Sequence, residues 1–238
     1  MVNPFIPTDT TRGSSTAVSY DQGLREHMVR VFNYMGIGLG MTGLIAFLVA
    51  YIPALSAIFL GSPVRWVAMF APFGFLLYLN IKLQSMPASR AKTMFWLFCG
   101  TMGLSTAAIF ALFTEASIAR AFFITAITFS SMALWGYTTK KDLTSMGSFL
   151  MMGVLGIVVA SLVNLFMQSN MLQWIVSVAG VAIFTGLTAY DTQKIKQTYS
   201  ASWGAEANSK LAIIGALSLY LDFLNAFQFL LSLTGERR

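Results

Sequence analysis

The stretch that most constrains this sequence runs from Leu211 to Leu233, with 23 residues, no Lys or Arg, and one acid, Asp222. As a helix it would be ~34 Å long, enough to cross the hydrocarbon core of a bilayer. A carboxyl group at the centre of such a helix is costly, so we expect it to face other helices or a wet cavity rather than lipid. Small and polar residues recur at helical spacing on the face of Asp222: Gly215, Ser218, Asn225 and Ser232.

Seven apolar runs of this kind, each near the ~20 residues that a spanning helix needs, follow one another along the chain. The 238 residues are 56% hydrophobic and 10% charged, whereas a soluble domain carries about 25% charged residues. The sequence therefore predicts an all-α polytopic membrane protein with seven transmembrane helices. Pro72 and Gly74 interrupt the second run, where a kink is expected. The runs cover residues 31–52, 65–81, 93–113, 121–138, 146–167, 172–190 and 211–233.

Residues 1–30 are polar and hold Pro4, Pro7 and scattered charges. They predict a cytoplasmic N-terminal tail that ends in a short amphipathic lead-in, with residues 31–238 as the transmembrane domain. A signal peptide is not expected, because no apolar core follows a basic start within the first 25 residues.

Lys and Arg are unevenly divided between the two sides of such a bundle. With the N-terminus inside, eleven of the fifteen lie in cytoplasmic segments, as the positive-inside rule favours. The rule also accounts for the net charge of +6, so no nucleic-acid partner is expected. Seven helices would place the C-terminus outside, whereas a re-entrant last segment would return Arg237 and Arg238 to the cytoplasm. The eleven are Arg12, Arg25, Arg30, Lys82, Arg90, Lys92, Lys140, Lys141, Lys194, Lys196 and Lys210.

Some small residues predict helix packing rather than chemistry. Two sets of small residues have the spacing of faces on which helices approach closely: Gly36 with Gly40, and Gly153 with Gly156 and Ala160. Cys99 is the only cysteine and lies within an apolar run, so it is expected to be a buried small hydrophobe.

Motifs for catalysis and for tightly bound groups are absent from the sequence, which has no H-E-x-x-H, no G-x-x-x-x-G-K and no cysteine cluster. An intramembrane serine protease needs a His near a Ser, and the only histidine, His27, is expected at the surface before the first helix. A retinal protein needs a lysine in its last helix, and residues 211–233 contain none. The sequence therefore predicts a protein that is not an enzyme and holds no resident cofactor.

Two of the nine acids lie in the predicted helices: Asp222, and Asp191 at the end of the sixth helix. Burial disfavours the charged form of a carboxyl group, and two neighbouring carboxyls that share one proton titrate as a unit. Such a pair would sense pH near neutrality without a cofactor. Two alternatives stay open: Asp222 bonds only to a neighbouring helix, and Asp191 only faces water.

The predicted depths of the two carboxyls oppose a simple contact. Asp191 ends its helix at the cytoplasmic side, whereas Asp222 lies eleven residues into the next helix and so ~16 Å deeper. Contact requires either that the sixth helix end deep beneath a wet vestibule, or that the seventh begin in water with residues 205–214 already helical.

Three segments resemble the Bax inhibitor-1 family of transmembrane proteins. They are LREHMVRVFNYMGIGLGMTGL at 24–44, AYDTQKIK at 189–196 and ALSLYLDFLNAF at 216–227, and the likeness covers roughly residues 24–235. The resemblance implies a seven-helix fold with the last helix at the centre, wrapped by the other six. It also implies a pH-sensitive calcium leak across the membrane.

In that family the aspartates that match Asp191 and Asp222 form a pH-sensing latch, and a basic residue near the cytoplasmic end of the second helix pairs with the first of them. The resemblance points to Lys82 or Arg90 for this role, with Arg90 preferred because it follows Pro87 and precedes the third helix. The alternative for either is a loop charge that only sets orientation. Ca²⁺ prefers 6–8 oxygen ligands, so the two carboxylates would hold it weakly and transiently, as suits a permeant ion.

Sequence and resemblance together predict a pH-sensitive cation (calcium) leak protein of a bacterial inner membrane, gated by Asp191 and Asp222. At high pH, repulsion between the carboxylates would separate them and move the second helix, and at low pH a shared proton would close the path. The alternative is a non-transporting membrane protein that modulates a membrane protease or a stress response, with residues 1–24 as its handle. A generic secondary transporter is less favoured, since no repeat or matching pair of broken helices is found.

Overall fold

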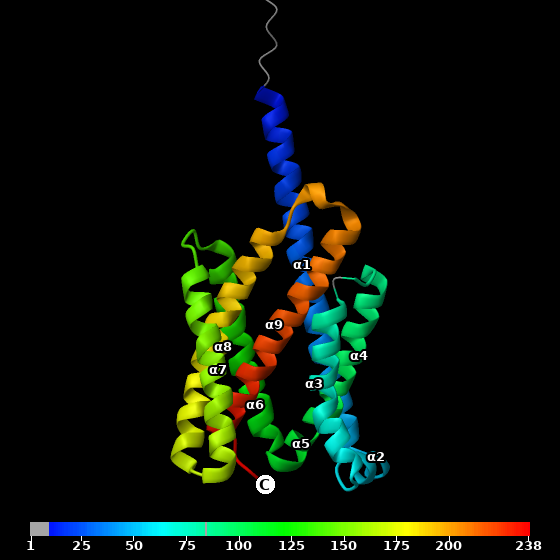
Figure 1. Cartoon of the computed structure of the whole chain (residues 1–238), viewed down its shortest axis with the longest axis vertical. Helices are drawn as coiled ribbons and strands as arrows, with labels where there is room; N and C mark the ends of the chain where they lie inside the picture. The colour runs from blue at the N-terminus through cyan, green and yellow to red at the C-terminus, as the bar shows by residue number, and fades with distance from the viewer. Residues whose placement is uncertain (1–9, 84) are drawn as a thin grey trace, which may run out of the picture.

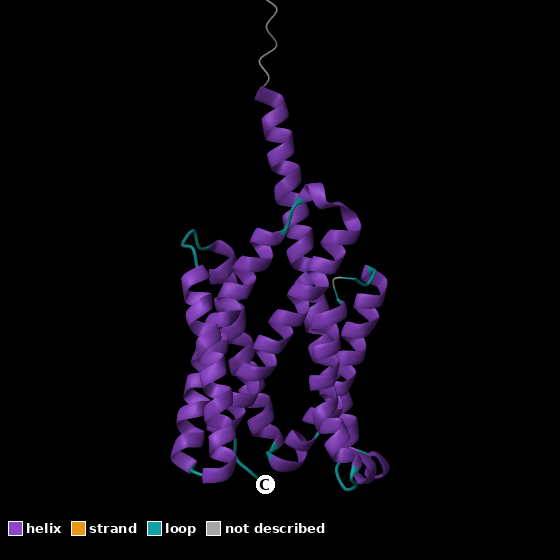
Figure 2. Cartoon of the chain, viewed as in Figure 1, coloured by secondary structure: helices purple, strands orange, loops and turns teal. Residues whose placement is uncertain are grey.

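The computed structural model describes residues 10–83 and 85–238, with side chains from Gln22 onward except that of Asn80. Within this part the chain folds into helices joined by short loops (Figures 1 and 2). The elements are α1 Thr10–Tyr51, α2 Pro53–Phe59, α3 Val64–Lys82, α4 Ala88–Thr106, α5 Ala108–Leu112, α6 Glu115–Thr138, α7 Thr144–Met167, α8 Asn170–Thr198, the 3₁₀ helix η1 Ala201–Trp203, and α9 Gly204–Thr234.

Six helical segments of the described chain are long and apolar enough to cross a membrane. They correspond to α1, α4 with α5, α6, α7, α8 and α9. The second predicted run behaves differently: α2 and α3 together pass the same test but are bent by 74° where they join. The sharp bend thus lies at residues 60–63, upstream of the expected kink, while α3 continues as a helix through Pro72.

Helix α1 begins before the first apolar run. It is helical from Thr10, and Leu24, Met28 and Val31 are buried in the main core. These residues recur at helical spacing, which explains why the lead-in packs against the bundle. The predicted boundary between tail and transmembrane domain at residue 30 stays a prediction, and residues 1–9 lie outside the described part.

The expectation that His27 lies at the surface is wrong. Its side chain is only 4% exposed, because it follows Leu24 around the buried face of α1. Its ring lies 5.2 Å from that of Tyr199, measured between centroids, and its Nε2 atom has no hydrogen-bond partner in the described structure.

Helix α9 is the most buried of the candidate spans. In its most apolar window 61% of the residues are buried, against 11–33% in the other five. It packs on α1, α4, α6 and α8, and its contact with α8 is the most extensive of any pair of elements. Figure 1 shows α9 running obliquely between α1 and α4 on one side and α6 and α8 on the other.

The last segment is a single helix in the structure, not the re-entrant hairpin that was the predicted alternative. Helix α9 is continuous from Gly204 to Thr234, and the chain after it returns to the junction of α5 and α6. There Arg238 N donates to Leu112 O, and the Arg238 guanidinium pairs with Glu115 at 3.3 Å. The C-terminus therefore lies at the end of the bundle opposite the start of α1 (Figure 1).

The glycines that let helices approach closely are only partly those expected. Gly36, Gly40 and Gly156 have open space where a Cβ would stand, so the predicted packing role is wrong for these three. The close approach on α1 is made instead by Gly38, where a Cβ would come within 2.9 Å of Cys99 Sγ. Gly153 faces Ile183, as a packing glycine should, and Cys99 is fully buried as expected. A difference of two residues moves a side chain to another face of a helix, which is why spacing alone selected the wrong pair.

Candidate functional site

The side chain of Asp222 lies inside the bundle. It is 5% exposed, and its Oδ2 atom has no hydrogen-bond partner in the described structure. Its neighbours in α9, Tyr220 and Phe223, are also buried. A buried carboxyl oxygen without a partner is costly, so this position is one where a proton or a movable partner is needed.

Two contacts fix the register between α8 and α9, which run antiparallel. Gly215 of α9 lies against Ile195 of α8, where a Cβ would come within 2.9 Å of the Ile195 side chain. About five turns away, toward the start of α8, the Ser177 hydroxyl donates to Ser232 Oγ over 3.3 Å. The two helices therefore remain paired along most of their length.

In this register Asp222 is about level with Thr188, so Asp191 lies roughly one helical turn (~5 Å) further along α8. The carboxyl groups of Asp191 and Asp222 interact electrostatically. Helix α9 starts at Gly204, so residues 205–214 are helical, as one of the two predicted solutions to the depth problem requires.

The predicted basic partner is not brought to Asp191. Arg90 and Lys82 are both exposed, and in the described structure neither forms an ion pair with Asp191. Arg90 lies in the first turn of α4, which packs on α1, α3 and α9. The cation whose charge acts on Asp191 is Lys194, one turn further along α8. This proximity could have been predicted from the sequence, because residues three apart, such as Asp191 and Lys194, lie on the same side of a helix.

A buried polar network next to Asp222 was not predicted. The hydroxyls of Thr42 on α1 and Tyr220 on α9 lie 2.7 Å apart, and the Thr42 hydroxyl donates to the carbonyl of Cys99 on α4 over 2.9 Å. Tyr220 is fully buried, and its ring packs edge-on against Phe95 and Phe98. The network ties α1, α4 and α9 together at Tyr220, two residues from Asp222 along α9, and so helps to hold this part of α9 in place.

Comparison with known proteins gives the family of this chain. A family model described as inhibitor of apoptosis-promoting Bax1 matches residues 24–238. The chain belongs to the Bax inhibitor family. The match includes α8 and α9, the two helices that carry Asp191 and Asp222.

Relatives of this Bax inhibitor family protein match over nearly their whole length. A protein of Rickettsia prowazekii is 40% identical over 231 residues, which cover 97% of this chain and 98% of its own. Inner membrane protein YbhL of Escherichia coli K12 is 38% identical, with 94% and 97% covered. A membrane protein of Streptococcus pyogenes serotype M1 is 30% identical, with 91% and 95% covered. The similarity therefore extends over the complete bundle.

The oxygen ligands that this Bax inhibitor family protein offers to a cation are few. Among the described residues no three His, Cys, Asp or Glu side chains converge on one point. Asp191 and Asp222 could contribute only part of the 6–8 oxygens that Ca²⁺ prefers. Such a site suits an ion that keeps much of its water and leaves readily.

Proposed function

We propose that this protein is a pH-sensitive cation leak, with calcium as the permeant ion, gated by Asp191 and Asp222. The observation that carries the proposal is the buried Oδ2 atom of Asp222, which lacks a hydrogen-bond partner and lies about one helical turn from the level of Asp191. A lone charged acid inside a bundle is costly. Two neighbouring acids that share one proton carry a single charge between them, and burying that shared charge costs less.

In this mechanism the pair with one shared proton carries a single negative charge, and α8 and α9 stay closely packed. Loss of that proton leaves two neighbouring negative charges in a region of low dielectric constant, where their repulsion is far stronger than in water. The repulsion favours a separation of the two carboxyls and opens a polar path beside α9. Lys194, one turn further along α8, supplies a positive charge that acts on Asp191.

We further propose that the bent pair α2 and α3 forms a seventh span and that α9 is the innermost helix of the seven. The burial of α9 and its contacts with four other helices support this arrangement. A location in a bacterial inner membrane with a cytoplasmic N-terminus fits both the name of the Escherichia coli relative and the distribution of Lys and Arg. Arg90, in the first turn of α4, then lies at the cytoplasmic end of the bundle and would reach the latch only after the helices move.

The decisive experiment measures calcium entry into proteoliposomes that contain the purified protein and a trapped calcium indicator. Flux is recorded at several pH values between about 6 and 8, the range in which a shared proton would be lost. The variants are Asp191→Asn and Asp222→Asn, each of which keeps the shape but removes a titratable group. Glu26→Gln is the matched control, since Glu26 is an exposed acid on α1.

The wild type and Glu26→Gln should leak more at high pH than at low pH, and each aspartate variant should lose this dependence. Unchanged pH dependence in both aspartate variants would rule out the latch. Absence of flux from the wild type at every pH would instead favour the alternative function, a non-transporting partner of a membrane protease or stress-response protein.

A further inference from the structure

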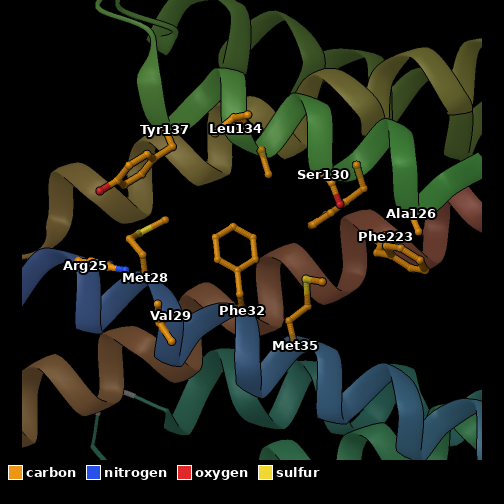
Figure 3. A pocket seen from close by; sticks show the side chains of 12 residues that line it. Arg25, Met28, Val29, Phe32, Met35, Ala126, Ser130, Leu134, Tyr137 and Phe223 are labelled. Carbon is orange, nitrogen blue, oxygen red and sulfur yellow. The ribbon is translucent and has the colours of Figure 1, made fainter.

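Helices α1 and α6 are separated by a hollow of about 710 Å³ that is open along its side. The side chains of Phe32 and Met35 on α1, Ser130 and Leu134 on α6, and Phe223 on α9 line it (Figure 3). The hollow is within the size range of cavities that hold small ligands, about 300–1,000 Å³. Its location among the spanning helices means that the neighbouring medium is the lipid bilayer.

The walls of this hollow are almost entirely apolar, and its polar groups lie at one end. Arg25 and Tyr137 lie at that end, and Ala126 and Phe223 at the other (Figure 3). From Arg25 to Met35, α1 rises ~15 Å, which is about half of the ~30 Å hydrocarbon core. The hollow therefore has the depth of one leaflet and a cation at the level where headgroups begin.

A second basic group strengthens the positive charge at this end. Lys196 on α8 donates to the carbonyl of Tyr137 over 2.8 Å, and its ammonium lies 5.0 Å from the centre of the Tyr137 ring. The acid next to Arg25 on α1, Glu26, does not line the hollow; it lines a neighbouring surface depression that Arg25 also lines. The end of the hollow is thus complementary to an anion.

In the opposite half of the space between α1 and α6, the charged residue of the lining is an acid in an ion pair. A cavity of about 350 Å³ there shares Phe223 with the first and includes Glu115, which pairs with Arg238. Of these two cavities, only the first therefore combines an apolar slot with a basic group that is not in an ion pair. Neither Asp191 nor Asp222 lines either cavity, so the hollow is separate from the proposed latch.

We propose that the hollow between α1 and α6 binds one acyl chain of an anionic phospholipid, with the headgroup phosphate beside Arg25. The acyl chain would fill the space that separates α1 from α6 and would cover Phe223, the residue next to Asp222. Dispersion and the fit of the chain supply the affinity, and the attraction of Arg25 for phosphate supplies the preference for an anionic lipid.

The test is native mass spectrometry of the delipidated protein in detergent, titrated with phosphatidylglycerol or with phosphatidylcholine that carries the same chains. Ser130→Trp and Val29→Trp fill the hollow from its two walls. Both residues are exposed, so a larger side chain can be placed there without displacing core residues. Ile127→Trp is the matched control, since Ile127 is a 69% exposed residue of α6 that does not line the hollow. Arg25→Gln removes the positive charge.

The wild type and Ile127→Trp should retain one phosphatidylglycerol about fivefold more strongly than phosphatidylcholine, the ratio that ~1 kcal/mol per basic residue produces. Both tryptophan variants in the hollow should lose the retained lipid, and Arg25→Gln should lose most of the preference for phosphatidylglycerol. Equal retention of both lipids by the wild type would overturn the proposal, as would lipid retention in both tryptophan variants. A dimer that both of these substitutions abolish would show that a helix of a second copy fills the hollow instead, and would equally overturn it.

Discussion

Gly136 of α6 lies directly against the backbone carbonyl of Ala189 on α8, two residues before Asp191. A Cβ at Gly136 would overlap that carbonyl oxygen, and backbone atoms have little freedom to move away. Gly136→Ala should therefore destabilise the protein by ~1–3 kcal/mol or more, as overpacking in a tight interface does. Thermal unfolding in detergent, followed by intrinsic fluorescence, measures the loss. Gly156→Ala is the control, because nothing lies within 4 Å of its Cβ position, and an equal loss in both variants would contradict the prediction.

The hydroxyl pair of Thr42 and Tyr220 gives a second stability prediction. Thr42→Val leaves the buried Tyr220 hydroxyl without its partner at 2.7 Å and also removes the bond to Cys99 O. Hydrogen bonds between membrane helices contribute ~0.6–1.7 kcal/mol, so each of Thr42→Val and Tyr220→Phe should cost about that amount. A double-mutant cycle measures the coupling between them. Strictly additive effects would mean that the two hydroxyls do not stabilise each other.

The α6–α7 loop should depend on a side chain of α8. Gln193 accepts a hydrogen bond from Leu143 N over 2.9 Å and donates to Lys141 O over 2.8 Å, and it is buried. Gln193→Leu keeps the volume but removes both bonds, which leaves two backbone groups unpaired. Limited proteolysis with trypsin should then cut after Lys140 or Lys141 faster than in the wild type. Gln197→Leu, an exposed position one turn later, serves as the control.

Much of this fold follows from the sequence because a bilayer allows few solutions. Apolar runs of ~20 residues must be helices, since only helices satisfy every backbone hydrogen bond within one segment. The polar stripe of the last run likewise predicted that Asp222 faces protein, and its side chain is buried. The bend between α2 and α3 was missed because the run after Pro63 was taken alone, without the helical turns before Gly61.

Side-chain partners were harder to predict than helices. His27 was predicted at the surface because its side chain is polar. Its position in the helix, on the same face as the buried residues Leu24 and Val31, was the better guide. The Thr42–Tyr220 pair joins residues 178 positions apart, and no local pattern marks such a contact. The preference for Arg90 came from family resemblance, whereas the nearer cation, Lys194, depends only on helical spacing.

The orientation of the bundle gives the last prediction. Ser145 and Ala116 are exposed at the starts of α7 and α6, which lie at opposite ends of the bundle. With a cytoplasmic N-terminus, a membrane-impermeant maleimide added to spheroplasts should label Ala116→Cys but label Ser145→Cys only after the membrane is permeabilised. The native Cys99 is fully buried and should stay unlabelled, so it need not be removed. The reverse pattern would mean that the excess of Lys and Arg lies outside, against the positive-inside rule, and that the proposed leak is regulated by the pH of the other compartment.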